Sequence, residues 1–224
     1  ISKQASLRAS DVSASWPSRL SFDLNYAGQD FSVQTQLCGC HWVSSVLGSL
    51  AVALIMNVPI EKGIAALKEF QPVQQRMSPV LLGQDITLIR DDTKASLDTI
   101  FPVFDFLRFA MAKKKMIIFG TLSDYPGASS SRYVTIARKA FEVADKVVFV
   151  GPVAYELRKL RSVNNGDKLF IFKDKHELLT FLPVELRPGD LVVAKASGVD
   201  RFNLVIKKLR EKMMKDQGCD ISFQ

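Results

Sequence analysis

The sequence predicts an α/β protein whose main part is a doubly wound, mostly parallel sheet. Short, continuously apolar runs alternate with amphipathic stretches over residues 76–224, and this pattern is typical of strands whose two faces are covered by helices. Hydrophobic residues make up 47% of the chain and charged residues 24%, as in globular proteins. The longest apolar run, residues 46–56, is shorter than the ~20 residues that cross a bilayer, so we expect a buried helix there and no membrane partner.

The first 72 residues have a different pattern. Apolar residues alternate with polar ones over residues 20–24 and again over 31–37, and Ala27-Gly28-Gln29-Asp30 lies between them, which predicts a β-hairpin. Residues 42–56 are apolar nearly all round, so we expect a helix that is buried on most of its faces. Pro59 suits the start of a second helix over about residues 60–70.

The rest of the chain predicts a regular alternation of strands and helices. The expected strands cover residues 86–89, 116–120, 146–151, 168–172 and 190–197. The expected helices cover residues 96–112, 130–144, 153–161 and 174–182, with a last one from residue 199. Such βαβ units build one complete domain over residues 75–224. Residues 1–74 contain too few strands for a domain of the same kind and are expected to be part of another one.

Charge and cysteine content narrow the class of protein. The net charge of +7 suits anionic partners such as nucleotides and phosphates. Aromatic residues are not interleaved with the basic clusters, so we do not expect nucleic acid to bind. Three cysteines are an odd number, which favours a reducing, cytoplasmic location over a secreted disulfide scaffold. The chain begins with Ile1 and shows no signal peptide, so we expect it to be a fragment of a longer protein.

One short segment, Cys38-Gly39-Cys40-His41, invites a metal interpretation. A structural zinc site needs four ligands, usually with two to four residues between the cysteines. The other candidates, His176 and Cys219, are far away in the sequence. We therefore predict no metal site in this fragment. The residues alone leave two roles open for His41: contact with a ligand near the start of a helix, or an ordinary loop histidine.

Two strand ends carry polar side chains, and ligands bind beyond the carboxyl ends of strands in sheets of this kind. The first strand end is Asp91-Asp92-Thr93-Lys94. Carboxylates can accept hydrogen bonds from ribose hydroxyls, and lysine can neutralise a phosphate. The alternative is that Asp92 or Thr93 caps the next helix.

The second strand end is Lys195-Ala196-Ser197-Gly198, which leads into the last helix. Unpaired N–H groups at a helix start, together with a lysine, suit a carboxylate or a phosphate. The alternative is a plain turn between strand and helix. No G-x-x-x-x-G-K-[ST] phosphate loop is present in the sequence, so this polypeptide alone is not expected to hydrolyse ATP.

Taken in order, these segments resemble the Mur ligase family, the ATP-dependent enzymes that build the peptide of bacterial peptidoglycan. The family's G-x-H-N-x-x-N loop corresponds to GCHWVSS at residues 39–45, and a phrase like L-K-x-F-x-P-V-x-x-R-M corresponds to residues 67–77. The strand-end motifs correspond to DDTKAS at 91–96 and GDLVVAKAS at 189–197. The resemblance covers roughly residues 20–210 and is strongest to members that add D-alanyl-D-alanine.

The resemblance implies a domain assignment and a chemistry. Residues 1–74 would be the tail of the central ATPase domain, and residues 75–224 the C-terminal Rossmann-like domain. With ATP and Mg²⁺, the intact protein would convert a carboxylate, such as that of a UDP-muramoyl peptide, into an acyl phosphate. An amino acid or a D-alanyl-D-alanine-like amine would then attack it. The missing domains of the same protein would complete the site.

The resemblance also assigns roles to individual residues. Those near the phosphates or the acyl phosphate would be catalytic: Lys94 and Arg76. Those at the nucleotide would be His41, Ser45, Asp91 and Asp92. Those that seat the incoming amine substrate would be Lys195, Ser197 and Arg201.

Four positions depart from the family pattern. Trp42 and Ser45 replace the two asparagines of the loop, Leu97 replaces another asparagine, and Ala196 replaces a glycine. The family stretch like G-D-M-x-E-L is Gly120 to Tyr125 here, with the sequence GTLSDY. These changes remove amides that can hydrogen-bond to a ligand. They leave two alternatives open: a ligase for a substrate other than a peptidoglycan precursor, and a binding or scaffold protein that has lost catalysis.

Overall fold

The structure, a computed structural model, describes residues 6–83, 85–123, 130–155 and 167–215. The chain divides into two compact units. One comprises Ile1–Val73 with Phe109–Met111, and the other comprises Gln74–Arg108 with Ala112–Gln224. Each unit is described by itself below. Within the described ranges, no helix combines the length and the apolar character needed to cross a membrane.

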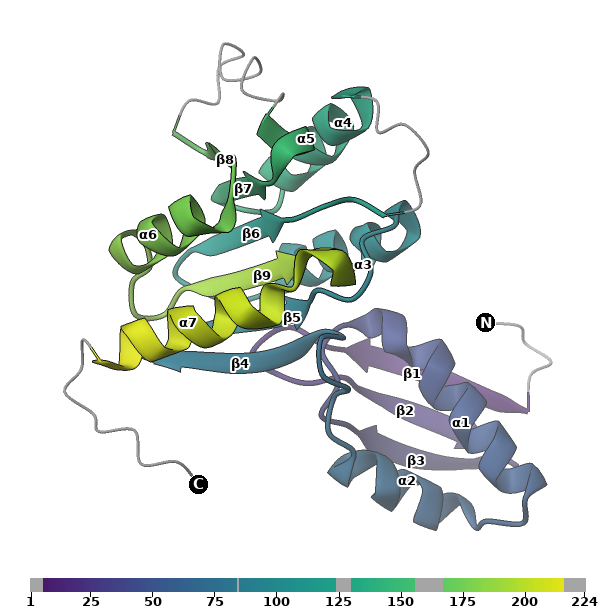
Figure 1. Cartoon of the computed structure of the whole chain (residues 1–224). Helices are drawn as coiled ribbons and strands as arrows, with labels where there is room; N and C mark the ends of the chain where they lie inside the picture. The colour runs from purple at the N-terminus through teal and green to yellow at the C-terminus, as the bar shows by residue number, and fades with distance from the viewer. Residues whose placement is uncertain (1–5, 84, 124–129, 156–166, 216–224) are drawn as a thin grey trace. The chain divides into compact units, whose positions relative to one another are not determined.

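The first unit is a three-stranded antiparallel sheet with two helices (Figure 1). Its strands are β1 (Leu7–Ser13), β2 (Ser21–Tyr26) and β3 (Gln29–Gln34), and its helices are α1 (Val43–Ile55) and α2 (Ile60–Glu69). The predicted hairpin is confirmed as β2 and β3, joined through Ala27 and Gly28, which both have positive φ. Positive φ at both central residues is the turn geometry that matches strand twist. Strand β1 was not predicted, because only Leu7 and Ala9 of it are even partly buried.

Helix α1 is less buried than its composition predicts. It packs against the sheet through Val43, Val46 and Leu50. On its other side, Val52 and Ile55 are 61% and 78% exposed. The expectation of burial on most faces is therefore wrong within this unit, because the unit supplies neighbours for one side of the helix only. Helix α2 begins after Pro59, as predicted.

The second unit is built on a six-stranded sheet in the order β4-β5-β9-β6-β7-β8. Its strands are β4 (Ser78–Gly83), β5 (Ile86–Asp91), β6 (Lys115–Phe119), β7 (Lys146–Val150), β8 (Leu169–Phe172) and β9 (Leu191–Lys195). All neighbours run parallel except β4 and β5. The mostly parallel sheet is thus confirmed. The edge strand β4 was not predicted, since it contains Pro79, a residue that sheets accept mainly at their edges.

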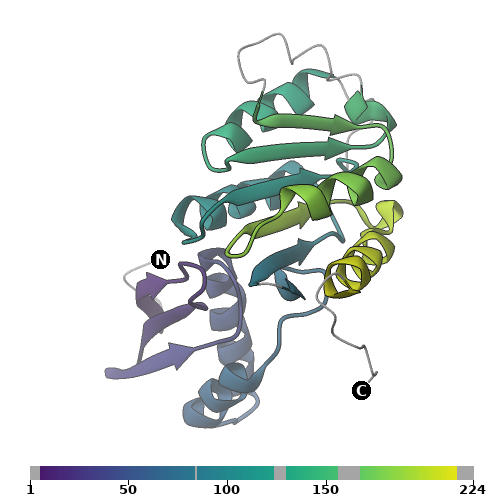
Figure 2. The ribbon, with the colours of Figure 1, turned by 90° about the vertical axis from the view of Figure 1, so that its left-hand side faces the viewer.

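Helices cover both faces of this sheet, as the doubly wound class requires. They are α3 (Leu97–Phe109), α4 (Ser130–Phe141), α5 (Pro152–Tyr155), α6 (Lys175–Glu185) and α7 (Phe202–Lys215). Figures 1 and 2 show α6 and α7 on one face and α3 and α4 on the other. The remainder of the helix expected at 153–161 lies outside the described residues.

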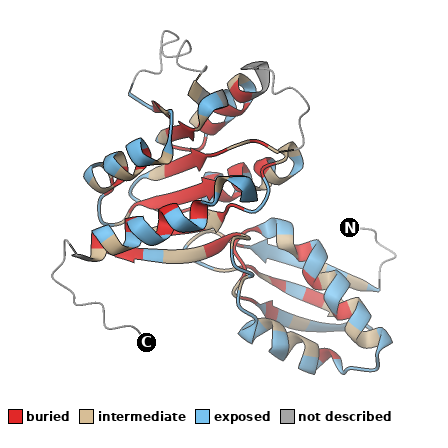
Figure 3. Cartoon of the chain, in the orientation of Figure 1, coloured by how far each residue is buried: buried red, intermediate tan, exposed pale blue. Residues whose placement is uncertain are grey.

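Each face of the sheet has its own apolar core, and the central strands β6, β7 and β9 between them are almost entirely buried (Figure 3). Toward α6 and α7, residues such as Leu88 and Val192 pack against Leu182 and Phe202. Toward α3 and α4, aromatic rings dominate: the ring of Phe119 contacts Phe104 and Phe149, and Tyr133 contacts Phe149. This packing holds the strand ends, where the candidate site lies, in a fixed arrangement.

Candidate functional site

The strand order brings the two predicted strand-end motifs together. Strand β9, the last of the described strands, lies between β5 and β6. Asp91 is therefore paired in register with Lys195, and Lys195 with Phe119. Because these strands are parallel, the segments that follow them all leave the sheet at the carboxyl ends of its strands. Doubly wound sheets bind their ligands at these ends.

Asp91 and Lys195 form a buried ion pair at this edge. The Lys195 ammonium Nζ lies 2.5 Å from Oδ2 of Asp91, and the Lys195 side chain has no exposed surface. Burial raises the pKa of the Asp91 carboxyl and lowers the pKa of the Lys195 ammonium, and in each case the partner's charge opposes that shift. Lys195 was expected to seat a substrate, but here it contacts Asp91. A direct contact with a ligand would require the pair to open.

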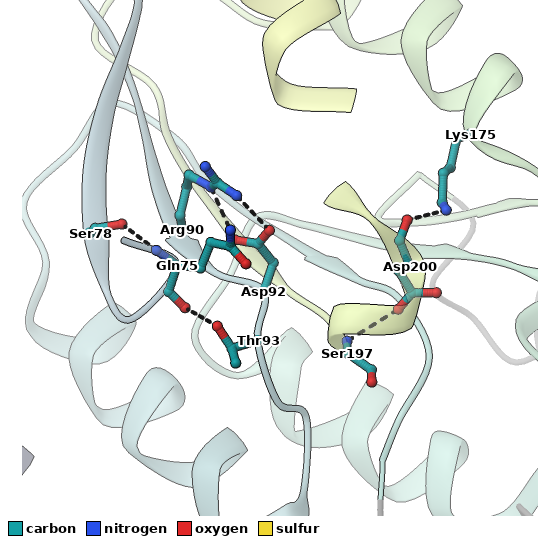
Figure 4. A network of polar contacts seen from close by, with 8 residues as sticks. All are labelled: Gln75, Ser78, Arg90, Asp92, Thr93, Lys175, Ser197 and Asp200. Atoms are coloured by element: carbon teal, nitrogen blue, oxygen red, sulfur yellow. Dashed lines mark hydrogen bonds and ion pairs between the residues drawn. The ribbon is translucent and has the colours of Figure 1, made fainter. Parts of the chain in front are cut away.

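Asp92 forms a second ion pair beside the first (Figure 4). The guanidinium of Arg90 donates to both carboxylate oxygens, at 3.1 and 2.8 Å, and the Asp92 side chain is 1% exposed. Helix α3 begins only at Leu97, so neither Asp92 nor Thr93 caps it. Lys94 is exposed at the same strand end. The site thus has an exposed cation next to two buried carboxylates that already have cationic partners.

Arg76 is half-buried in the turn that precedes β4. The residues on both sides of it have left-handed backbones, with φ of 64° at Gln75 and 47° at Met77. Thr93 Oγ1 donates to the carbonyl of Gln75 at 3.1 Å (Figure 4). The positive charge of Arg76 lowers the pKa of Asp91 and the pKa of Lys195. Its influence on each pKa is smaller than that of burial or of the Asp91–Lys195 interaction. Arg76 therefore belongs to the same electrostatic cluster as the buried pair.

Asp200 links the segments that follow β6 and β9. Its carboxylate accepts hydrogen bonds from the backbone N–H and the hydroxyl of Thr121, both at 2.7 Å, and from the backbone N–H of Ser197 at 3.1 Å. The ammonium of Lys175 donates to the Asp200 carbonyl (Figure 4). A Cβ added at Gly120 would lie 2.5 Å from Oδ2 of Asp200, so this close approach requires glycine.

Sequence reasoning missed Asp200. The spacing of Ser197 and Asp200 matches a capping box and could have drawn attention to it. Ser197 was expected to help seat a substrate, but its backbone N–H already donates a hydrogen bond to the Asp200 carboxylate. Arg201 is exposed and has a left-handed backbone with φ of 48°. The exposed guanidinium of Arg201 therefore lies next to Asp200, which joins the segments that follow β6 and β9.

His41 and Ser45 belong to the first unit. His41 is exposed in a short 3-10 turn, Cys40–Trp42, and its ring centre lies 5.0 Å from that of Trp42. Ser45 is exposed in the first turn of α1. Their expected contact with a nucleotide stays a prediction.

The cysteines near His41 lie in different environments. Cys38 is buried and Cys40 exposed, and Cys219 lies outside the described residues. In the described ranges, no group of three or more histidine, cysteine or acidic side chains is placed to hold a metal ion.

Burial gives Cys38 a testable effect on stability. Burial raises the pKa of the Cys38 thiol from 9.0 to about 11, although the positive charge of Arg19 and its hydrogen bond to the thiol lower that pKa. Because the unfolded chain ionises first, the free energy of unfolding should be unaffected by this group below pH 9 and should fall toward pH 11. The expected loss is about 3 kcal/mol over that interval.

Denaturant unfolding can be followed by the fluorescence of Trp16 and Trp42, which both lie in the first unit. Cys38→Ala should flatten the fall in stability between these pH values. Cys40→Ala is the matched control and should keep it, because the Cys40 side chain is exposed. An unchanged fall in Cys38→Ala would contradict the assignment.

The family model described as "Mur ligase, glutamate ligase domain" matches residues 75–198, more than half of the chain. The chain belongs to the Mur ligase family. The matched range contains Arg76, both ion pairs and both strand ends. The family resemblance drawn from the motifs is thereby confirmed.

Curated Mur ligases align with nearly the whole chain. The UDP-N-acetylmuramoyl-tripeptide–D-alanyl-D-alanine ligase of Mycobacterium tuberculosis is 25% identical over 223 residues, which cover 90% of this chain and 44% of the relative. The UDP-N-acetylmuramoyl-L-alanyl-D-glutamate–2,6-diaminopimelate ligase of Listeria monocytogenes is 20% identical over 212 residues, or 92% of this chain and 42% of the relative. The chain spans less than half the length of these Mur ligases.

Solved Mur ligase structures share the fold. MurF from Acinetobacter baumannii superposes with a TM-score of 0.83 at 19% identity, covering 94% of this chain and 46% of that structure. A MurF ligase from Thermotoga maritima in complex with ADP gives a TM-score of 0.78 at 16% identity, covering 96% of this chain and 48% of that structure. At these identities the likeness is one of fold.

Proposed function

We propose that this chain is the C-terminal portion of an ATP-dependent ligase that joins a carboxylate to an amine. The observation that carries the proposal is the match of residues 75–198 to the ligase family. This range includes Arg76, Lys94 and Lys195, the cations near the carboxyl ends of β5 and β9. The matched relatives are named as ligases that act on UDP-N-acetylmuramoyl peptides. We therefore propose a peptidoglycan precursor as the carboxylate substrate, and an amino acid or D-alanyl-D-alanine as the amine. We also propose a cytoplasmic location for the reaction.

The described residues suit a phosphate-bearing ligand. ATP would supply the phosphoryl group that turns the carboxylate into an acyl phosphate, which the amine attacks with release of inorganic phosphate. Lys94, exposed at the end of β5, and Arg76 would neutralise charge on the phosphate oxygens. We propose that Mg²⁺ is bound by the rest of the intact protein. Within the described residues, no group of three or more histidine, cysteine or acidic side chains is placed to hold a metal ion.

The other assignments follow from where the side chains lie. Asp92 would accept from the ribose hydroxyls, and because its side chain is 1% exposed and paired with Arg90, this contact requires the pair to open. Ser197 and Arg201, at the end of β9, would seat the incoming amine substrate, with the exposed guanidinium of Arg201 facing its carboxylate. His41 and Ser45 of the first unit would contact the nucleotide.

Phosphate release from Mg-ATP by the full-length protein tests this function. UDP-muramoyl peptides would be offered with and without D-alanyl-D-alanine, and with a panel of amino acids. We expect release that requires both a carboxylate and an amine, and a kcat in Lys94→Ala that is lower by about 10²–10³. Lys207→Ala, an exposed lysine of α7, is the matched control and should leave kcat unchanged.

The alternatives give different results in the same experiment. Nucleotide binding without release by any of these pairs would favour a ligase for another substrate. That outcome fits the changes at Trp42, Ser45, Leu97 and Ala196. No nucleotide binding would favour a binding or scaffold protein that has lost catalysis.

A further inference from the structure

The segment that carries Lys94 has an irregular backbone. Strand β5 ends at Asp91 and helix α3 begins at Leu97, so residues 92–96 belong to no helix or strand. Buried backbone groups need hydrogen-bond partners, and for an irregular segment many of these partners come from elsewhere in the chain. The partners of this segment therefore decide where the exposed side chain of Lys94 can lie.

The residue before Lys94 is held by two other segments. The carbonyl of Thr93 accepts a hydrogen bond from the backbone N–H of Gly198 at 3.0 Å. The hydroxyl of Thr93 donates to the carbonyl of Gln75 at 3.1 Å (Figure 4). These two contacts join the start of the irregular segment to the end of β9 and to the turn before β4.

The residue after Lys94 is held by Ser123 alone in two hydrogen bonds. The backbone N–H of Ala95 donates to the Ser123 hydroxyl at 3.0 Å, and the Ala95 carbonyl accepts from the Ser123 N–H at 3.1 Å. Ala95 is fully buried. Since one serine binds both the N–H and the carbonyl of Ala95, it fixes the direction of the backbone as well as its distance.

Ser123 is itself fastened through the two residues before it. The N–H and the hydroxyl of Thr121 donate to the Asp200 carboxylate, both at 2.7 Å. The N–H of Leu122 donates to the hydroxyl of Tyr133, a residue of α4 that is 2% exposed, at 3.4 Å. Three successive residues after β6 thus bind three different parts of the fold, and Ser123 is a fixed point for Ala95.

A fixed backbone matters for a lysine that neutralises a phosphate. The lysine side chain has a flexible four-carbon stem, so the ammonium can sample a wide volume unless its backbone is held in place. Cations stabilise developing charge best when they are positioned in advance. A misplacement of ~1 Å can lower a rate about a hundredfold. The contacts on both sides of Lys94 supply such positioning.

We propose that Ser123 is a positioning residue for Lys94. Its hydroxyl and its N–H hold Ala95, and the fixed backbone then presents Lys94 at the carboxyl end of β5. This role requires no contact between Ser123 and the ligand. The phosphate-bearing ligand of Lys94 rests on the proposed function, whereas the hold of Ser123 on Ala95 does not.

Hydrogen exchange on the full 224-residue chain tests the hold without any ligand. Ser123→Ala removes the hydroxyl that accepts from the Ala95 N–H. We expect the Ala95 amide to exchange about tenfold faster, because its N–H loses its acceptor. Amides in the middle of the sheet, such as that of Ile118, should keep their protection.

Thr180→Ala is the matched control. It also removes a hydroxyl bound to a backbone group, since Thr180 donates to the His176 carbonyl at 3.1 Å within α6. Exchange at Ala95 should stay unchanged in this variant. If Ser123→Ala does not fold, Ser123→Cys gives the same measurement, because sulfur is a weaker acceptor than oxygen. Wild-type exchange at Ala95 in the Ser123 variant would overturn the proposal.

Phosphate release by the full-length protein shows whether Ser123 acts through Lys94. We expect Ser123→Ala to lower kcat about tenfold and to leave the KM of the amine unchanged. In the Lys94→Ala background, Ser123→Ala should cause no further loss, because the cation that it positions is already absent. Ser123→Thr keeps the hydroxyl and should keep most of the kcat.

The possible results separate positioning from a general structural role. A further tenfold loss of kcat in the Lys94→Ala background would overturn the proposal, since Ser123 would then act on something else. An unchanged kcat in Ser123→Ala despite faster exchange at Ala95 would overturn it too. Faster exchange at Ala95 in a protein whose wild type releases no phosphate would support the hold on Ala95 and reject the ligase function.

Discussion

Lys195→Met should destabilise the second unit by about 3–5 kcal/mol, the usual cost of leaving one charge of a buried pair without its partner. The Lys195 side chain has no exposed surface, and the Asp91 side chain is 9% exposed, so water cannot replace the lost ammonium. Methionine fills a similar volume, which limits the contribution of a cavity. Denaturant unfolding followed by circular dichroism measures the change.

The pH dependence distinguishes an unpaired charge from a simple packing defect. Burial raises the pKa of Asp91 above its ordinary value of 3.8, and loss of Lys195 removes the largest opposing influence. When the pKa of a carboxyl is higher in the folded protein than in the unfolded chain, the free energy of unfolding rises as the pH falls and the carboxyl becomes protonated. The destabilisation by Lys195→Met should therefore shrink as the pH falls toward 3.8.

Two further variants control this prediction. Asp91→Asn/Lys195→Met should recover much of the lost stability, because neither charge remains buried. Asp105→Ala breaks an ion pair with Arg108 whose side chains are 67% and 51% exposed, and it should cost less than about 1 kcal/mol. A Lys195→Met protein as stable as wild type at neutral pH would show that Asp91 does not need its partner.

The core of the fold could be predicted because its strands are apolar on both faces. Every residue of β9 is buried, as is every residue of β6 and β7 after the first, and in β5 only Thr87 and Arg90 are partly exposed. The helices between these strands follow from their amphipathic pattern. Strands at the edges give a weaker signal. In β1, Leu7 and Ala9 are only partly buried, and β4 contains Pro79 and the exposed Leu81.

The site could be predicted only as two separate strand ends. Asp91 and Lys195 are 104 residues apart in the sequence, and their contact depends on β9 lying between β5 and β6. Strand order is a property of the whole sheet, which a local pattern does not contain. The same holds for Asp200, whose partner Thr121 lies 79 residues earlier.

Asp200→Ala should destabilise the second unit by about 2–4 kcal/mol. The substitution removes an acceptor of three hydrogen bonds and leaves the backbone N–H groups of Thr121 and Ser197 without their partner at partly buried positions. The stability of Asp200→Asn should lie between that of Asp200→Ala and that of wild type, because the asparagine keeps one side-chain oxygen that can accept a hydrogen bond. The unfolding midpoint in denaturant measures the order of the three proteins.

Asp98→Ala is the matched control, since Asp98 is exposed in the first turn of α3 and should lose no more than about 1 kcal/mol of helix-dipole stabilisation. If Asp200→Ala unfolds at the same denaturant concentration as wild type, then Asp200 does not hold the two segments together. If it is destabilised as expected, the segments after β6 and β9 share one anchor. Residues that follow β9, including Arg201, then depend on the segment after β6 for their position. If the intact protein has the proposed ligase function, the same variant should therefore raise the KM of the amine substrate more than the KM of ATP.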